Sequence, residues 1–290
     1  MAQTKKAKTY PVVRTGRLFR PSPDPIGGNL QLSFEQLLSK TNRRLYRQTR
    51  NYCVKIDLDP SGDVEVPGSI DVYALADSWM NEQALKMAHN MYMENSEDER
   101  ARLSDSQEAR WQDFRTVSGA NITIADPLQF DEAFNAAALT TGEFNDTIVV
   151  DKAGASRFFT WTEFGNASRY SILAEYNKAG DAQESPNTNT ADMPYDDLMA
   201  DDDAAMAEAL QVRGNEPPYD ANGVLQASPW VKVGTLQSGQ SQRLSTGYFN
   251  APCGFVILKA TGAAAVPEGL LQWTVKAGDY KGVHAPSLLE

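Results

Sequence analysis

The chain has 290 residues, 41% of them hydrophobic, and a net charge of −11 at pH 7. This length suits one large domain or two small ones. No stretch holds the roughly 20 apolar residues that a membrane-spanning helix needs, and no apolar run follows the first basic residues, so we expect neither membrane insertion nor a secretory signal.

The charges are distributed unevenly along the chain. The first 55 residues contain twelve basic and two acidic residues, a local net charge of +10. The remaining residues therefore carry −21. Because net charge does not select a fold, we explain this asymmetry by a tethered basic segment that binds a polyanion while the rest of the chain has another role.

We expect residues 1–45 to form a basic N-terminal arm, disordered or extended, with a short helical turn at residues 30–38. The segment combines scattered cations and prolines with little apolar periodicity, so it buries too little apolar surface to offset the entropy lost on ordering. Its cations, and those of the cluster at residues 42–50, suit sequence-independent neutralisation of phosphate groups. The expected nucleic-acid-binding residues are Lys5, Lys6, Lys8, Arg14, Arg17, Arg20, Arg43, Arg44, Arg47 and Arg50.

Three aromatic residues among these cations, Tyr10, Phe19 and Tyr46, are candidates to stack on unpaired bases. The arm also has plainer interpretations. It would serve equally as a flexible solubilising tail, or as an import signal that a receptor recognises. The size of the charge contrast favours the interpretation as a polyanion-binding arm.

The rest of the chain, residues 46–290, predicts mainly β structure. Residues 52–58 alternate between apolar and polar side chains, which is the period of a half-buried strand. Further short runs of this kind are separated by turn residues, and this spacing predicts a β-sandwich or barrel without βαβ units. The other expected strands are residues 70–75, 110–118, 147–151, 157–163, 170–176, 230–236, 242–249, 255–260 and 271–277.

A short helical insertion is expected at about residues 78–109. Asp77 or Ser78 can cap a helix whose apolar residues recur every three or four positions. Residues 96–99, with the sequence Ser-Glu-Asp-Glu, match the capping box that would begin a second, shorter helix.

Residues 180–220 contain eleven acidic residues and one basic residue, Arg213. A segment this long without strong apolar periodicity predicts a large acidic surface loop, with a short helix possible in principle at residues 201–210. The only metal binding that we expect is weak binding of divalent cations by acidic residues at contacts between subunits.

Residue patterns typical of catalysis or of a structural metal are missing from the sequence. The two histidines and two cysteines are too far apart for a zinc site of ordinary spacing, and Cys53 and Cys253 are expected to be buried thiols. The usual phosphate-loop, dinucleotide, nucleophile-elbow and zinc-protease motifs are absent. Residues 57–63 resemble the start of a calcium loop, but Gly68 occupies the position of its bidentate acid. We therefore predict that the protein is not an enzyme, has no catalytic residue and no defined metal site, and has no cofactor apart from the weak cation binding described above.

Four stretches and Trp79 carry a resemblance to a known family. The stretches are IDVYAL at residues 70–75, ALKMA at 84–88, ARWQDFR at 109–115 and GYFNAPCGFVI at 247–257. Together with the basic arm and the strand-rich body, they resemble the single jelly-roll capsid proteins of small icosahedral viruses, most like those of circular Rep-encoding single-stranded DNA viruses. The resemblance covers about residues 46–114 and 230–277. It implies a single jelly-roll β-sandwich with long loops, self-assembly into an icosahedral shell, and an inward-facing arm that touches the genome.

The first functional interpretation is therefore a viral capsid protein that packages its genome through the basic arm. Its partners would be many further copies of the chain, the viral genome, expected to be single-stranded DNA, and a host receptor that the sequence does not identify. It would be found in the virion, and in the host cell nucleus or cytoplasm during assembly. The alternative is a non-enzymatic β-sandwich binding module that recognises a carbohydrate or a partner, such as a minor structural protein of a phage.

Overall fold

The structure, a computed structural model, describes residues 11–19, 29–58, 69–104, 113–119, 123–124, 126–130, 132–133, 136–139, 144–150, 154–161, 169–181, 229–237, 244–261 and 271–290. Across these residues the fold is mainly β, with antiparallel sheets and few helices, an arrangement compatible with a β-sandwich. Within the same residues, no helix is long and apolar enough to cross a membrane.

The larger sheet has six strands in the order β12-β3-β14-β1-β6-β7. All of its pairings are antiparallel, and the pairing of β1 with β14 joins segments from opposite ends of the chain. Its strands are β1 (Thr15–Phe19), β3 (Asn51–Leu58), β6 (Asp126–Phe130), β7 (Ala136–Ala138), β12 (Phe249–Pro252) and β14 (Leu271–Val275).

The second sheet has five strands in the order β11-β4-β13-β2-β5. Its pairings are antiparallel except that of β2 with β5, and β11 has a register shift between Lys232 and Gly234. Its strands are β2 (Asn29–Ser33), β4 (Ser69–Leu75), β5 (Thr123–Ile124), β11 (Trp230–Gln237) and β13 (Phe255–Thr261).

Eight of these strands follow a regular path between the two sheets. The chain crosses from the larger to the smaller sheet between β1 and β2, between β3 and β4, and between β12 and β13. It returns to the larger sheet between β2 and β3, between β11 and β12, and between β13 and β14. Only β4 and β11 are both consecutive in this series and adjacent in one sheet. The segment between them contains the helices α2 (Trp79–Asn95), α3 (Glu97–Arg100) and α5 (Ile172–Asp181).

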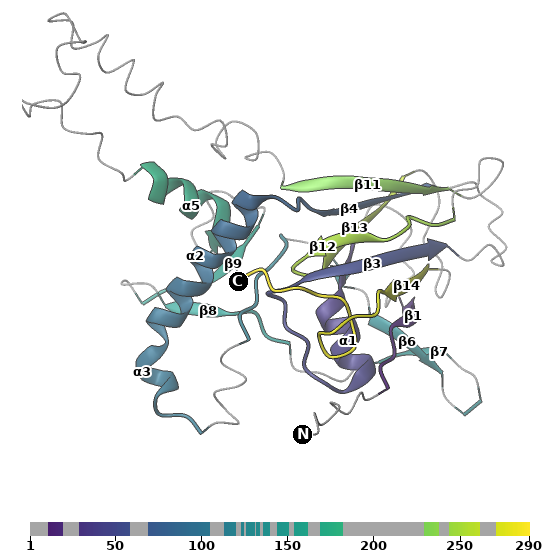
Figure 1. Cartoon of the computed structure of the whole chain (residues 1–290), viewed down its shortest axis with the longest axis horizontal. Coiled ribbons are helices and arrows are strands. Elements are labelled where there is room, and N and C mark those ends of the chain that lie inside the picture. The colour runs from purple at the N-terminus through teal and green to yellow at the C-terminus, as the bar shows by residue number, and fades with distance from the viewer. Residues whose placement is uncertain are drawn as a thin grey trace, which may run out of the picture.

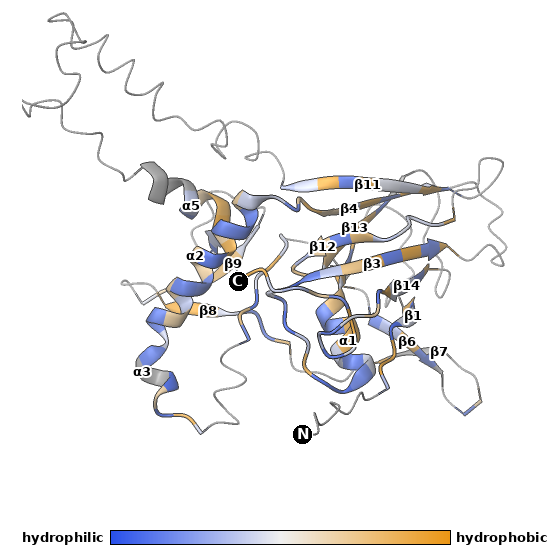
Figure 2. Cartoon of the chain, viewed as in Figure 1, coloured by the Kyte–Doolittle hydropathy of each residue, from blue (hydrophilic) through white to orange (hydrophobic). Residues whose placement is uncertain are grey.

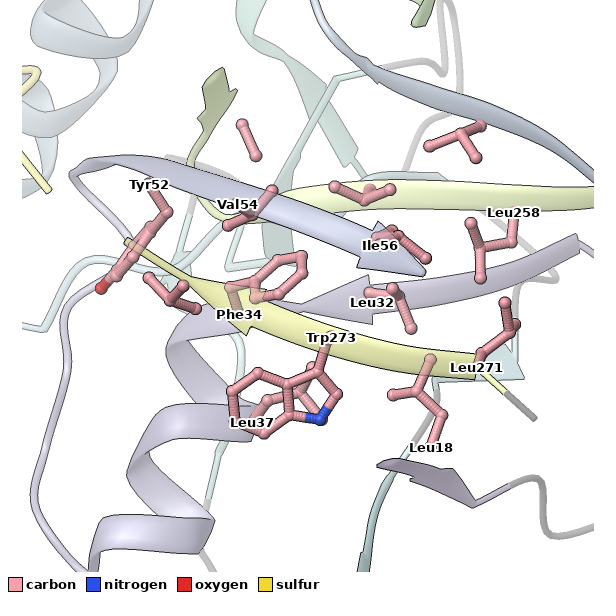
Figure 3. Packing of buried hydrophobic residues seen from close by; sticks show 14 of the residues in the cluster. Leu18, Leu32, Phe34, Leu37, Tyr52, Val54, Ile56, Leu258, Leu271 and Trp273 are labelled. Carbon is pink, nitrogen blue, oxygen red and sulfur yellow. The ribbon is translucent and has the colours of Figure 1, made fainter. Parts of the chain in front are cut away.

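The main hydrophobic core lies where the two sheets face each other (Figure 3). Val54 and Ile56 of β3 are fully buried, as alternate residues of a strand with one face in the core should be. Trp273 of β14 is also fully buried, and its ring meets Phe34 edge-on with 6.3 Å between centroids. A Cβ atom on Gly16 would lie 2.8 Å from the Trp273 ring, so β1 packs on this tryptophan only because residue 16 is glycine.

Helices α2 (Trp79–Asn95), α3 (Glu97–Arg100) and α5 (Ile172–Asp181) gather at one end of the sheets (Figure 1). Of the two caps that the sequence offers, Asp77 and Ser78, the structure has Ser78, whose side chain accepts a hydrogen bond from the Asn81 N–H. A second core cluster joins α2 and α5 to a small sheet of order β10-β9-β8. Hydrophilic residues cover much of α2 and α3 in Figure 2. The strands of the small sheet are β8 (Ile148–Val150), β9 (Ser156–Thr160) and β10 (Arg169–Ser171).

The structure corrects the expected extent of the N-terminal arm. Within residues 1–45, β1 and β2 are strands of the two sheets. A helical turn was expected at residues 30–38, but residues 30–33 belong to β2, and the helix α1 (Phe34–Asn42) begins only after them. Leu18, Leu30 and Leu32 are buried, so these short segments gain their stability from distant partners and not from local periodicity. The folded body therefore begins well before residue 46.

Three expected strands differ from the structure. At residues 170–176, β10 ends at Ser171 and α5 follows at once, because a short apolar run suits a buried helix as well as a strand. At residues 113–118 the only ladder contact is an isolated bridge at Val117. Of the strand expected at residues 242–249, the described residues 244–248 form only an isolated bridge at Ser245, and β12 begins at Phe249. Residues 182–220 of the expected acidic loop and residues 105–109 of the helical insertion lie outside the described residues.

Candidate nucleic-acid interface

The chain turns sharply where α1 ends. Arg43 caps the helix in the left-handed conformation, with φ 51° and ψ 40°, and the Arg44 N–H donates to the Ser39 carbonyl at 3.3 Å. Glycine or asparagine usually occupies this position, because other side chains are strained there. The turn leaves the side chains of Arg43 and Arg44 exposed to solvent.

A second tight turn lies near the C-terminal end of the chain. Tyr280 and Val283 exchange two backbone hydrogen bonds of 3.1 and 3.0 Å, with Lys281 and Gly282 between them. Both central residues have positive φ, 50° and 91°, which is typical of the two-residue type I′ hairpin. A Cβ atom on Gly282 would lie 2.7 Å from a methyl group of Val12, so the turn packs closely on the N-terminal segment.

Two tyrosines join these turns. The Tyr46 hydroxyl donates to the Lys281 carbonyl at 3.0 Å, and the Arg47 N–H donates to the Tyr280 hydroxyl at 3.1 Å. The two rings meet edge-on, and the Lys281 ammonium donates to the Leu45 carbonyl. Tyr46 is fully buried, so it is not available to stack on bases, contrary to the prediction from the sequence.

Arg50 lies beside the C-terminal hairpin and stacks on Tyr280. Its guanidinium lies 3.6 Å from the centre of the Tyr280 ring, and its Nη1 donates to the Ala285 carbonyl at 2.9 Å. A planar guanidinium stacked on a ring and bonded at one nitrogen has a fixed orientation. We call the group formed by Arg43, Arg44, Arg47, Arg50 and Lys281 the basic surface.

The electrostatics of Lys281 show that the basic surface concentrates positive charge. Partial burial lowers the pKa of Lys281, and Arg44, Arg47 and Arg50 lower it further by like-charge repulsion. Asp113 opposes these effects only in part. The lysine therefore lies within electrostatic range of three arginines, and a bound anion would relieve their mutual repulsion.

The N-terminal segment enters the body beside this surface. The Val13 N–H donates to the Asn42 side-chain oxygen at 2.7 Å, and the Asn42 side-chain amide donates to the Val13 carbonyl at 2.9 Å. Arg14, two residues after Val12, is exposed. Residues 11–14, the end of α1 and the C-terminal hairpin therefore share one region of the molecule, and Figure 1 shows the C-terminal segment beside α1.

A buried polar network holds the loop after α1 in place. The Gln48 side chain accepts hydrogen bonds from the Thr116 N–H and hydroxyl at 2.6 and 2.9 Å, and donates to the Thr116 carbonyl at 3.1 Å. Beside it, Arg115 and Glu35 form an ion pair of 3.0 Å whose side chains are 4% and 0% exposed. Burial raises the pKa of Glu35 to about 7, although Arg115 opposes the rise.

The structure brings together only part of the predicted binding set. Arg44, Arg47 and Arg50 lie around Lys281, whereas Arg17 is half-buried in β1 opposite Gln272 of β14. The sequence-based prediction missed Lys281, for which the only local signal is a Lys-Gly pair of the kind that forms tight hairpin turns. The predicted residues that lie outside the described part of the chain are Lys5, Lys6, Lys8 and Arg20.

Metal ligation has no candidate among the described residues, since no three side chains of His, Cys, Asp or Glu come together there. Comparison of the chain with known protein families, with curated proteins and with solved structures finds no match. The chemistry that the basic surface offers is the binding of anionic groups by ammonium and guanidinium donors.

Proposed function

We propose that the chain is a viral capsid protein that self-assembles into an icosahedral shell and packages a nucleic-acid genome, expected to be single-stranded DNA. The strand order supports a single jelly roll. One sheet contains the order β12-β3-β14-β1 and the other the order β11-β4-β13-β2. Strands at the same position in these two orders are consecutive in the series of eight, for example β3 and β4 or β14 and β13. Jelly rolls have eight strands in two such sheets, and viral coat domains are among the proteins that use them.

The observation that supports nucleic-acid packaging is the basic surface, because a fold alone does not imply a function. Its cations lie where the N-terminal segment joins the body, so Lys5, Lys6 and Lys8 are attached next to it through residue 11. One polyanion can then contact both. In a shell, this end of each subunit would face the packaged genome.

The charge of the remaining chain fits the same proposal. Residues 56–290 carry −21, so identical bodies repel one another unless apolar contacts or counterions offset the repulsion. Packaged nucleic acid would neutralise the basic residues of each subunit. The virion is the expected location.

The alternative proposal is a non-enzymatic binding module, because lectin-like domains share the jelly-roll architecture. Such a module would recognise its ligand as a monomer or small oligomer. We favour the capsid proposal because recognition of an uncharged carbohydrate gives no role to a cationic surface at the base of a basic N-terminal segment.

Assembly is the direct test. Size-exclusion chromatography and negative-stain electron microscopy of the purified protein should show closed particles of many subunits. A stable monomer or dimer across a wide range of salt and pH would overturn the capsid proposal and favour the binding module.

Packaging is tested separately by replacing Lys5, Lys6 and Lys8 with glutamine. Deleting residues 1–50 is unsuitable, since it removes β1, β2 and α1. The triple variant should assemble with less nucleic acid, measured by the ratio of absorbance at 260 and 280 nm. The matched control replaces three lysines of the body. Equal nucleic-acid content in the two variants would show that the N-terminal lysines do not contribute to packaging. The control residues are Lys86, Lys232 and Lys259.

A further inference from the structure

We infer that Lys281, with Arg44 and Arg47, forms a preorganised phosphate-binding site on the folded body, which contacts the backbone of single-stranded nucleic acid without reading its bases. The inference rests on the proposed function and deepens it. It assigns a binding role to a C-terminal hairpin that is separate from the N-terminal arm, and it names the chemical group that the hairpin contacts.

The backbone of the hairpin provides the first argument. A lysine at positive φ is uncommon, because its Cβ atom is crowded in the left-handed region. The described residues include three non-glycine residues with positive φ, and two of these are cations of the basic surface, Arg43 and Lys281. Strain of this kind persists where a particular side chain must occupy a particular place.

The side chain of Lys281 is also held in position. Its ammonium donates to the Leu45 carbonyl, and the Tyr46 hydroxyl donates to the Lys281 carbonyl at 3.0 Å. An ammonium group has three donors, so the bond to Leu45 leaves two for a ligand. Holding the cation in advance reduces the entropy that binding would otherwise cost.

The ion pairs of the described residues provide the second argument. Other cations have acidic partners, such as Lys40 with Asp126 and Lys232 with Asp71. No acid within the described ranges forms an ion pair with Arg44, Arg50 or Lys281. A bound anion would stabilise these three cations. It would also relieve the repulsion by the neighbouring arginines, which adds to the larger effect of burial in lowering the pKa of Lys281.

The aromatic rings explain why the site would contact phosphates and not bases. Base recognition in single strands relies on rings that are free to stack. Tyr46 is fully buried, and Tyr280 carries the Arg50 guanidinium 3.6 Å from its ring centre. Both rings therefore support the cations, and the cations provide the contact surface.

The position of the site favours nucleic acid as the source of the phosphate. Val12 packs against Gly282 of the hairpin, so the segment that carries Lys5, Lys6 and Lys8 joins the body beside Lys281. A single strand that engages the N-terminal lysines can continue onto the basic surface. Both sets of cations then contribute to one salt-dependent interaction.

The test measures binding of a fluorescent oligothymidylate of about 30 nucleotides to the full chain by anisotropy, at salt concentrations between about 0.05 and 0.2 M. In the double variant Lys281→Asn, Arg44→Gln, two phosphate contacts are lost. The slope of log affinity against log salt should become shallower by about 1.4, and affinity at about 0.15 M salt should fall about tenfold. The control Lys259→Gln removes an exposed cation of β13 and should leave the slope unchanged.

Asparagine suits the left-handed turn, so Lys281→Asn should melt at the same temperature as the original protein or higher. If the double variant fails to fold, Lys281→Asn alone should make the slope shallower by about 0.7. Equal slopes for the variants and the original protein would overturn the inference.

Two further outcomes would also overturn it. The effect of the variants could vanish on a strand of the same length with abasic sites, which would assign the contact to bases. The variants could weaken binding to heparin and leave oligothymidylate unaffected, which would assign the surface to a sulfated glycan. Electron microscopy of the original protein tests the capsid proposal independently, because particles can form whether or not the body contacts phosphate.

Discussion

The basic surface and the polar network beneath it place similar residues in opposite surroundings. Arg115 is 4% exposed and is paired with Glu35 at 3.0 Å, with Asp113 at 3.4 Å on its other side. Arg44 is exposed, and no acid among the described residues forms an ion pair with it. A buried cation without an acidic partner is costly, whereas an exposed one is solvated by water. Arg115 is therefore part of the framework, and Arg44 is available to a ligand.

The largest expected effect comes from removing the buried cation. Arg115→Ala leaves the Glu35 carboxyl group buried without its partner and should lower the free energy of unfolding by about 3–5 kcal/mol. Urea denaturation measures the change. Arg44→Ala is the matched control and should change the midpoint little, since this side chain is exposed. Similar losses in the two variants would contradict the distinction between framework and surface.

The next effect is a dependence of stability on pH. Burial raises the pKa of Glu35 from 4.5 to about 7, so the folded protein binds this proton more tightly than the unfolded chain does. The stability contributed by the protonated group is fully present below about pH 4.5 and is lost as the pH rises through about 7. The loss amounts to about 3 kcal/mol.

Urea denaturation between about pH 5 and pH 8 measures this dependence, and the difference between the original protein and Glu35→Gln isolates the contribution of the one group. The variant has no carboxyl group at this position, so its stability should fall less over the same interval. Parallel curves for the two proteins would show that Glu35 does not titrate in this range.

The smallest effect lies at the basic surface itself. Arg50→Gln removes the guanidinium from the Tyr280 ring and should cost about 1 kcal/mol, because the interaction is only partly buried. Arg50→Lys keeps the charge but loses the planar stacking, so it should recover only part of the stability. Thermal melting followed by circular dichroism compares the variants, and full recovery by lysine would mean that charge alone matters.

The strands that the sequence predicts best are those with strong local signals. In β3, β4 and β14, apolar residues alternate with polar ones, and β13 begins with a continuous apolar run. The structure confirms all four strands within about two residues of the expected bounds. The free, buried state of Cys53 and Cys253 is confirmed as well. In contrast, β1 and β2 have only five residues each, which is too short for a clear local pattern, and β1 also contains a glycine and an arginine.

The cations of the basic surface were only partly predictable, because they come from two segments far apart in the sequence. The cluster at residues 42–50 is dense in arginine, and density alone identifies Arg44, Arg47 and Arg50 as candidates. Lys281 lies 231 residues beyond Arg50 and has no basic cluster around it in the sequence. The hydrogen bonds of Tyr46 and Tyr280, which bring it to the arginines, depend on how the sheets fold.

The sequence by itself determined the uneven charge, the mainly β character and the start of α2 after Asp77 or Ser78, because each depends on residues that are close together along the chain. Tertiary structure alone decided that residues 15–19 and 29–42 belong to the body, and which cations are buried and which are exposed. Burial is a property of the partners that surround a side chain. The partners of β1 and of the loop after α1 come from the opposite end of the chain.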